Sequence, residues 1–299
     1  MSLNWPYRFI FTLSEEELRR RRNALDLRGY YAQLSAIAVI LIICASRLYY
    51  GTFRSKLTTR SWWDSSAFKG AAETRRQYLI ALSWLGWLLS LSVWNSGDGM
   101  LKLVLPISRS WLMVAPDYLH LTKALAHVAL SQIPIQILLA PTSFIFASNP
   151  TLPSILSYVT SIPQTTLAPY HRLLGRLVIV PLLCGHAMLY LLFYVQVPHP
   201  IFGTVFSKRI RDPDVQYGLS GVSCAILILI CGRSALWKVR HALNLTSLDV
   251  RRRVFYTVHL TLVAGFLTLA YLHVAYARVF VLESIGVSLA NLAGCWLLA

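Results

Sequence analysis

The chain has 299 residues, of which 56% are hydrophobic and only 13% are charged, and its formal net charge is +16. Soluble globular chains contain about 25% charged residues, so this composition excludes an ordinary soluble protein and indicates an integral membrane protein. The basic residues flank apolar stretches, which favours membrane lipid over nucleic acid as their partner. The five cysteines lie in apolar segments without a CxxC pair, so we expect neither a disulfide scaffold nor a zinc site.

The N-terminal residues 1–28 are polar and charged, and residues 14–28 predict a short amphipathic helix at the membrane surface. Ser14 and Glu17 have the spacing of a capping box, and acidic residues precede a run of arginines. The first apolar run begins only near Gly29. We therefore expect no cleaved signal peptide and expect the first membrane helix to act as the insertion signal.

Apolar stretches long enough to cross a hydrocarbon core, which takes about 20 helical residues, recur along the rest of the chain. They predict an all-α polytopic membrane bundle of about seven transmembrane helices, with residues 29–299 as one domain. The expected spans are residues 29–49, 77–95, 117–140, 170–195, 216–236, 254–275 and 280–298.

Lysine and arginine in the short connections predict the orientation of the bundle. Residues 53–76 and 237–253 are both rich in these residues, and seven spans place both connections on one side, which would be the cytosol. The N-terminus would then face away, although its own arginines favour the opposite orientation. The glycosylation sequon at Asn244 lies in the second basic connection, so we expect Asn244 to stay unmodified.

Six of the eight histidines lie inside predicted spans, where ionisable residues are costly and usually functional, and four of these six form two widely spaced pairs on the fourth and sixth spans. His259 and His273 are fourteen residues apart, so they fall within about 40° of the same helix face and about 21 Å apart along the axis. His171 and His186 are fifteen apart and would diverge by about 60° in a regular α-helix. A π-bulge near Pro181 would absorb one residue and restore the alignment.

The fourth and sixth spans run in the same direction, so His171 is expected level with His259, and His186 level with His273. Each level offers two imidazoles from facing helices, as in six-coordinate ligation of a b-type haem iron. A histidine in a membrane helix can instead bond a neighbouring helix, but two helices with matching pairs favour two haems, one near each leaflet. Arg172 and Arg176 are candidate partners of the anionic propionates.

The remaining basic and imidazole side chains have more ordinary interpretations. The run Arg251–Arg253 is either a further propionate partner or plain loop charge. His120 and His127 share a helix face but lack a matching pair on another helix, so packing or a minor metal contact is expected. His199 and His241 are predicted to lie in loops.

Two motifs, HRLLGR followed by His186 and RRRVFYTVH followed by His273, resemble those of the ferric reductase and NADPH oxidase superfamily. The segment IPIQILLAP is similar to the Pro-containing helix of that family, and RGYYAQLSAIAVILI to the first helix of fungal ferric reductase-like metalloreductase components. The resemblance covers residues 25–299. It implies that His171 and His259 bind an inner haem and that His186 and His273 bind an outer one.

The chain departs from the family pattern in two ways. Its first histidine pair is fifteen residues apart where fourteen is usual, and no flavin-binding motif or GxGxxG follows the last span. FAD and NADPH would thus act only through a missing region or a flavoprotein partner.

The resemblance implies transmembrane electron transfer through two bis-histidine haems, as the membrane part of a metalloreductase that reduces Fe(III) or Cu(II). The plasma membrane and the endoplasmic reticulum are both possible locations. The alternatives are an NADPH oxidase-like haem domain that passes electrons to O2, and a degenerate or haem-free seven-helix protein.

Overall fold

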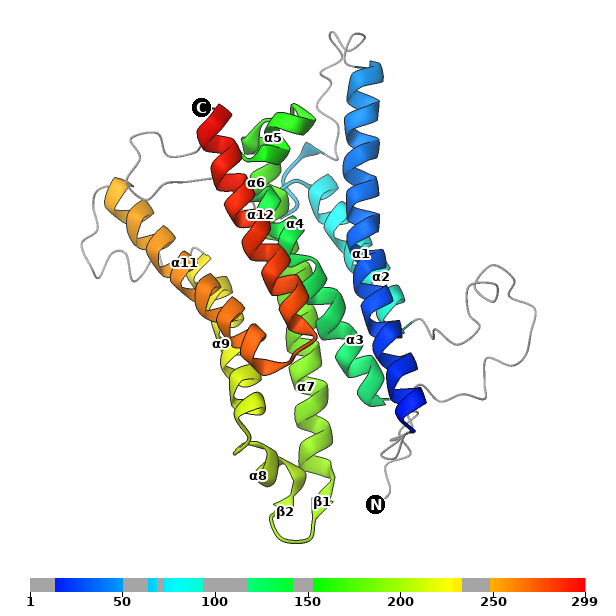
Figure 1. Cartoon of the computed structure of the whole chain (residues 1–299). Helices are drawn as coiled ribbons and strands as arrows, with labels where there is room; N and C mark the ends of the chain where they lie inside the picture. The colour runs from blue at the N-terminus through cyan, green and yellow to red at the C-terminus, as the bar shows by residue number, and fades with distance from the viewer. Residues whose placement is uncertain are drawn as a thin grey trace.

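The computed structural model describes residues 14–50, 64–68, 72–93, 118–141, 153–232 and 248–298. Most of these residues are helical, and the long helices run beside one another in alternating directions (Figure 1). Large apolar side chains are exposed along them, as expected of surfaces that face lipid. The prediction of an all-α polytopic membrane protein is confirmed.

Each of the seven predicted spans corresponds to one helix or one helical run. In chain order these are α1 (Glu15–Tyr50), α2 (Arg75–Val93), α3 (Tyr118–Ser131) with α4 (Ile133–Leu139), α6 (Gln164–Leu173) with η3 (Leu174–Ile179) and α7 (Val180–Gln196), α9 (Pro213–Gly232), α11 (Leu248–His273) and α12 (Ala277–Leu298). Four short elements were not predicted: α5 (Ile155–Thr160), α8 (Val205–Arg209) and the hairpin strands β1 (Pro198–His199) and β2 (Gly203–Thr204).

Five helical stretches among the described residues are long and apolar enough to cross a membrane: Glu15–Ser46, Gln164–Gln196, Pro213–Cys231, Arg253–His273 and Ala277–Leu297. The α2 helix and the α3–α4 run are shorter or less apolar. Several membrane spans are therefore supported, and the count of seven stays a prediction.

Helix α1 differs from the prediction of a separate surface helix before the first span. It runs unbroken through 36 residues, about 54 Å at 1.5 Å per residue, which is longer than the hydrocarbon core. No glycine-proline signal interrupts it, and Gly29 lies within it rather than at a break. The capping box is confirmed: the Ser14 N–H donates to Glu17 Oε2 at 3.0 Å, and the Glu17 N–H donates to Ser14 Oγ at 3.3 Å.

The span predicted at 117–140 is divided into α3 and α4 at Gln132. Pro134 lacks an N–H and cannot continue the hydrogen-bond ladder of α3. The chain tightens there, with the Gln132 N–H bonded to the Ala129 carbonyl at 3.2 Å. The buried Gln132 side chain accepts a hydrogen bond from Trp84 Nε1 at 3.0 Å, which ties this turn to α2.

The predicted π-bulge is present in the run that carries His171 and His186. The segment η3 has π-helical geometry, and the Val180 N–H bonds the Gly175 carbonyl five residues earlier. It ends at Ile179, two residues before Pro181. One residue is thereby absorbed between the two histidines, as their fifteen-residue spacing required.

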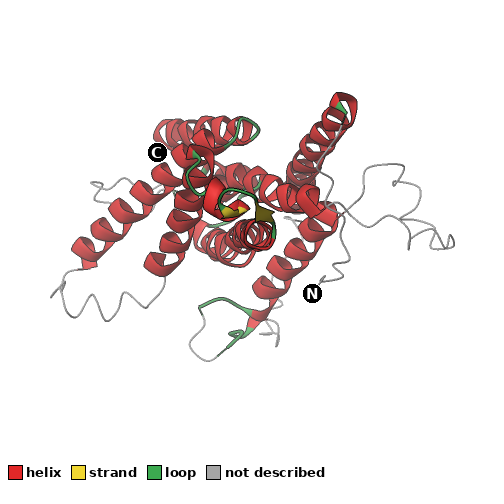
Figure 2. Cartoon of the chain, turned by 90° about the horizontal axis from the view of Figure 1, so that it is seen from below, coloured by secondary structure: helices red, strands yellow, loops and turns green. Residues whose placement is uncertain are grey.

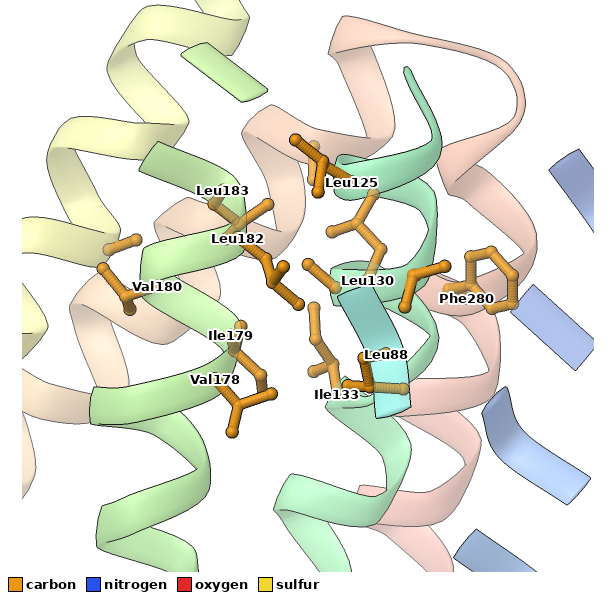
Figure 3. Packing of buried hydrophobic residues seen from close by; sticks show 14 of the residues in the cluster. Leu88, Leu125, Leu130, Ile133, Val178, Ile179, Val180, Leu182, Leu183 and Phe280 are labelled. Carbon is orange, nitrogen blue, oxygen red and sulfur yellow. The ribbon is translucent and has the colours of Figure 1, made fainter. Parts of the chain in front are cut away.

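The hydrophobic core lies between η3, α7, α2, α3 and α12 (Figure 3). Its fully buried members include Leu88, Val128, Val178 and Phe280. Viewed along the bundle, the hairpin at the end of α7 lies near the centre of the molecule (Figure 2). Helix α7 is thus a central helix of the bundle.

The C-terminal end of α1, the start of α11 and the end of α12 lie at one end of the bundle, and the β1–β2 hairpin lies at the other (Figure 1). We call the first end the inner end and the second the outer end. Asn244, His241 and the lysine and arginine residues between α9 and α11 lie outside the described residues. Which end faces the cytosol stays a prediction.

Candidate functional site

The structure brings the four histidines together in the two expected pairs. His171 on α6 faces His259 on α11, with ring centroids 6.4 Å apart and ring planes at 67°. His186 on α7 faces His273 at the end of α11, with centroids 6.5 Å apart and planes at 73°. The first pair lies nearer the inner end and the second nearer the outer end of the same two helical runs.

The separation within each pair is that of two imidazoles bound to opposite sides of one metal ion. A histidine nitrogen binds a metal at about 2 Å, and its ring centroid lies about 1.1 Å farther away, so the two centroids are about 6.2 Å apart. The observed 6.4 and 6.5 Å agree with this value. A direct hydrogen bond between the rings would bring the centroids closer.

Main-chain carbonyls orient three of the four rings through Nδ1. The acceptors are the Gln136 carbonyl for His171 at 2.9 Å, the Thr122 carbonyl for His186 at 2.7 Å and the Asp214 carbonyl for His273 at 2.6 Å. A carbonyl only accepts, so Nδ1 carries the proton and Nε2 keeps its lone pair. In metal-binding proteins, a hydrogen bond from the ring nitrogen that does not bind the metal commonly fixes the orientation of the histidine.

Gln136 holds His171 in two ways. Helix α4 ends at Leu139, and the Ala140 N–H bonds the Ile137 carbonyl. The Gln136 carbonyl is therefore free of a bond within the helix and accepts from His171. Its side-chain Nε2 donates to the His171 carbonyl at 2.9 Å. The same Nε2 would lie 3.0 Å from a Cβ at Gly175, so the glycine of HRLLGR leaves room for this contact.

His273 packs directly on the first turns of α9. A Cβ at Gly218 would lie 2.7 Å from His273 Cε1 and 2.9 Å from Nδ1, so only glycine fits beneath the ring. Asp214, whose carbonyl accepts from His273, is itself held by Arg209, with NH2 3.1 Å from Oδ2. Arg209 also pairs with Asp212, and α8 thereby fixes the start of α9.

His259 is the exception among the four. Its Nδ1 is buried and has no hydrogen-bond partner among the described residues. Its ring instead stacks on Phe255, four residues earlier on α11, with centroids 5.4 Å apart and planes at 19°. An aromatic face, not a carbonyl, sets the orientation of this ring.

Arg172 and Arg176, predicted as propionate partners, both contact one buried acid. Arg172 Nε donates to Glu73 Oε1 at 2.9 Å, Arg176 NH2 lies 3.5 Å from Glu73 Oε2, and Arg176 also donates to the Tyr78 hydroxyl at 2.7 Å. Burial alone would raise the pKa of Glu73, but the hydrogen bond from Arg172 and the charges of both arginines bring the pKa below its ordinary value. Glu73 is thus an ionised partner beside His171.

His120 and His127 both face α1, as their shared helix face predicted, and neither joins a histidine pair. His120 Nε2 lies 3.0 Å from Arg28 NH1. His127 Nε2 lies 3.2 Å from Asp26 Oδ1, and its ring meets Phe280 edge-on. Of the remaining predicted residues, His199 lies in strand β1 of the hairpin, Arg253 is exposed, and the side chains of Arg251 and Arg252 lie outside the described part.

The sequence interpretation missed the residues that support the histidines. Phe255 lies in the motif RRRVFYTVH and Gln136 lies in IPIQILLAP, so the motifs that indicated the family also contained these two residues. Glu73 and Gly218 carry no such signal, because each acts on a residue distant in the chain. Within the described ranges, no group of three or more His, Cys, Asp or Glu side chains gathers.

A comparison with protein families gives one match. Residues 125–270 match the family described as ferric reductase like transmembrane component. This stretch contains His171, His186 and His259, and it ends three residues before His273. No curated protein and no solved structure matches the chain.

Proposed function

We propose that this chain, whose residues 125–270 match the ferric reductase like transmembrane component family, is a membrane electron-transfer reductase component. It would carry electrons across the membrane through two b-type haems. His171 and His259 would hold the inner haem, and His186 and His273 the outer one. The observation that carries this proposal is the pair of facing imidazole sets, each with the centroid separation that one iron needs.

The donor set suits haem iron in several respects. Each pair presents two imidazoles, and in three of the four rings Nδ1–H donates a hydrogen bond to a main-chain carbonyl, which leaves Nε2 for the metal. The bare backbone at Gly218 admits the His273 ring. When bound, haem supplies the one-electron Fe(III)/Fe(II) couple.

The side chains of this protein hold, orient and insulate such a group. Arg172 and Arg176 offer positive charge beside the inner pair, and their guanidinium groups retain donors that Glu73 does not use. Two histidines held to each iron would leave no open coordination position. An acceptor would then be reduced without binding to the metal, and Fe(III), Cu(II) and O2 are the acceptors that we propose.

The electron donor in this proposal is a flavoprotein that binds FAD and NADPH, either as a separate partner or as a region outside these 299 residues. We expect the 299-residue chain alone not to oxidise NADPH, while its chemically reduced form passes electrons to ferric chelates. NADPH consumption by the purified chain would contradict this arrangement. The plasma membrane and the endoplasmic reticulum are the two proposed locations.

Single histidine substitutions test the assignment of the pairs. His171→Ala and His259→Ala should each remove the same haem, and His186→Ala and His273→Ala the other, so that each variant keeps about one haem per chain. His127→Ala, which alters a histidine outside both pairs, should keep both haems. Losses that combine one residue from each level would show that the pairs are assigned wrongly.

A further inference from the structure

The described residues just before α2 bring Glu73 against the helical run that carries His171. The Ala67 N–H bonds the Glu73 carbonyl at 3.1 Å, and the Arg75 N–H bonds the Ser65 carbonyl at 3.1 Å. Thr74 and Gln77 then cap α2, since the Thr74 N–H donates to Gln77 Oε1 at 2.8 Å. These bonds place the Glu73 side chain inward, where only 6% of it is exposed.

Both arginines of the HRLLGR motif converge on this carboxylate. They lie four residues apart on the helical run and meet the two different oxygens of Glu73. Arg172 is the direct neighbour of His171 in the chain. A buried negative charge therefore lies beside the inner pair, whereas the carboxylates described near the outer pair, Asp212 and Asp214, share Arg209 and are 33% and 44% exposed.

We propose that Glu73 is a positioning residue that sets the reduction potential of the inner haem, an inference that rests on the proposed function. It holds Arg172 and Arg176 at the inner level and adds a fixed negative charge there. Ferric haem carries one more positive charge than ferrous haem, so a nearby anion stabilises the oxidised form. Glu73 thus keeps the inner haem a stronger reductant than the arginines alone would allow, which favours transfer toward the outer haem.

The substitution Glu73→Gln tests this proposal because it removes the charge and keeps an oxygen that accepts from Arg172. A spectroscopic redox titration of the purified protein would follow the two haems, with the inner one identified by its absence in His171→Ala. We expect the inner haem to shift about tenfold toward its reduced form at a fixed potential, which is 59 mV for a one-electron couple. The outer haem should move much less.

Two variants separate charge from shape. Asp64→Asn makes the same charge change in the same segment, but Asp64 is 40% exposed and pairs with the exposed Arg76, so water screens it and neither haem should shift. The double variant Glu73→Gln with Arg172→Gln restores the local charge balance and should return the inner potential toward that of the wild type.

The outcomes distinguish this proposal from the proposed function. If the wild type holds no haem, the proposed function fails. If the wild type holds two haems and Glu73→Gln leaves the inner potential unchanged or lowers it, only the role of Glu73 is refuted. An equal shift in Asp64→Asn would also refute it, because the effect would then reflect general surface charge.

Discussion

The two histidine levels are built differently although their imidazole separations are nearly equal. At the outer level, main-chain carbonyls of Thr122 and Asp214 accept from both rings. At the inner level, one ring is held by the Gln136 carbonyl, while His259 is buried without a partner for Nδ1 and stacks on Phe255. The outer level is thus fixed by backbone, and the inner level partly by side chains.

This difference indicates how each level responds to change. Side-chain substitutions near the inner level can alter the ring of His259 or the charge around it without moving the backbone. The outer level tolerates most such substitutions, because its acceptors are peptide groups, but it depends on close helix packing. Hydrogen bonding to Nδ1 supports a metal-binding imidazole, and this support is present on both outer rings but on only one inner ring.

The largest expected effect is at the outer level, from Gly218→Ala. The new Cβ would lie 2.7 Å from His273 Cε1, so the ring or α9 must move, at a cost of about 1–3 kcal/mol. We expect loss of the outer haem and retention of the inner one, measured by haem content of the purified variant.

The matched control is Gly221→Ala, one turn farther along α9. A Cβ there would lie 3.6 Å from Leu269 Cβ, which is ordinary contact. It should keep both haems. If Gly218→Ala also keeps both with an unchanged outer spectrum, the outer level does not depend on close packing against α9.

A smaller effect is expected at the inner level from Phe255→Leu. The ring planes in both pairs are far from parallel, at 67° and 73°, so both haems should give strongly anisotropic low-spin electron paramagnetic resonance signals. Without the stacking partner, His259 has no hydrogen bond to hold its angle. The inner signal should broaden or shift, while the outer signal serves as the internal reference. A change confined to the outer signal would contradict the role of Phe255 in orienting His259.

The smallest effect concerns stability as a function of pH. The folded pKa of Glu73 lies below 4.5 because the hydrogen bond and charges of the arginines outweigh burial. A lowered pKa in the folded state gives stability that is complete above the unfolded pKa and is lost as the pH falls through the folded value. At neutral pH we expect Glu73→Gln to be less stable than the wild type by about 1 kcal/mol, since Arg172 is half exposed.

Thermal unfolding in detergent would measure this difference. The gap between wild type and Glu73→Gln should be constant from neutral pH to about pH 5 and narrow below pH 4.5. A gap that persists unchanged at pH 3 would mean that the charge of Glu73 contributes nothing to stability.

The sequence was sufficient to predict the histidine pairs because helical geometry follows from spacing alone. The fifteen-residue interval from His171 to His186, which contains Pro181, even predicted the π-helical turn that Leu174–Ile179 forms. The contacts that support the histidines could not be predicted from the sequence. Glu73 meets Arg172 across 99 positions of the chain, and the acceptor for His273 is a peptide carbonyl, which has no side-chain signature. The continuous α1 was also missed, because a change from polar to apolar residues does not by itself end a helix.

The most direct test of the account is the haem content of the purified 299-residue chain. We predict two b-type haems per polypeptide, with the absorption spectrum of low-spin, six-coordinate iron in both redox states. Protein concentration from amino-acid analysis and haem from its pyridine complex give the ratio. A well-folded preparation with less than one haem per chain, after growth with ample haem supply, would contradict the central claim that the two histidine pairs are haem ligands.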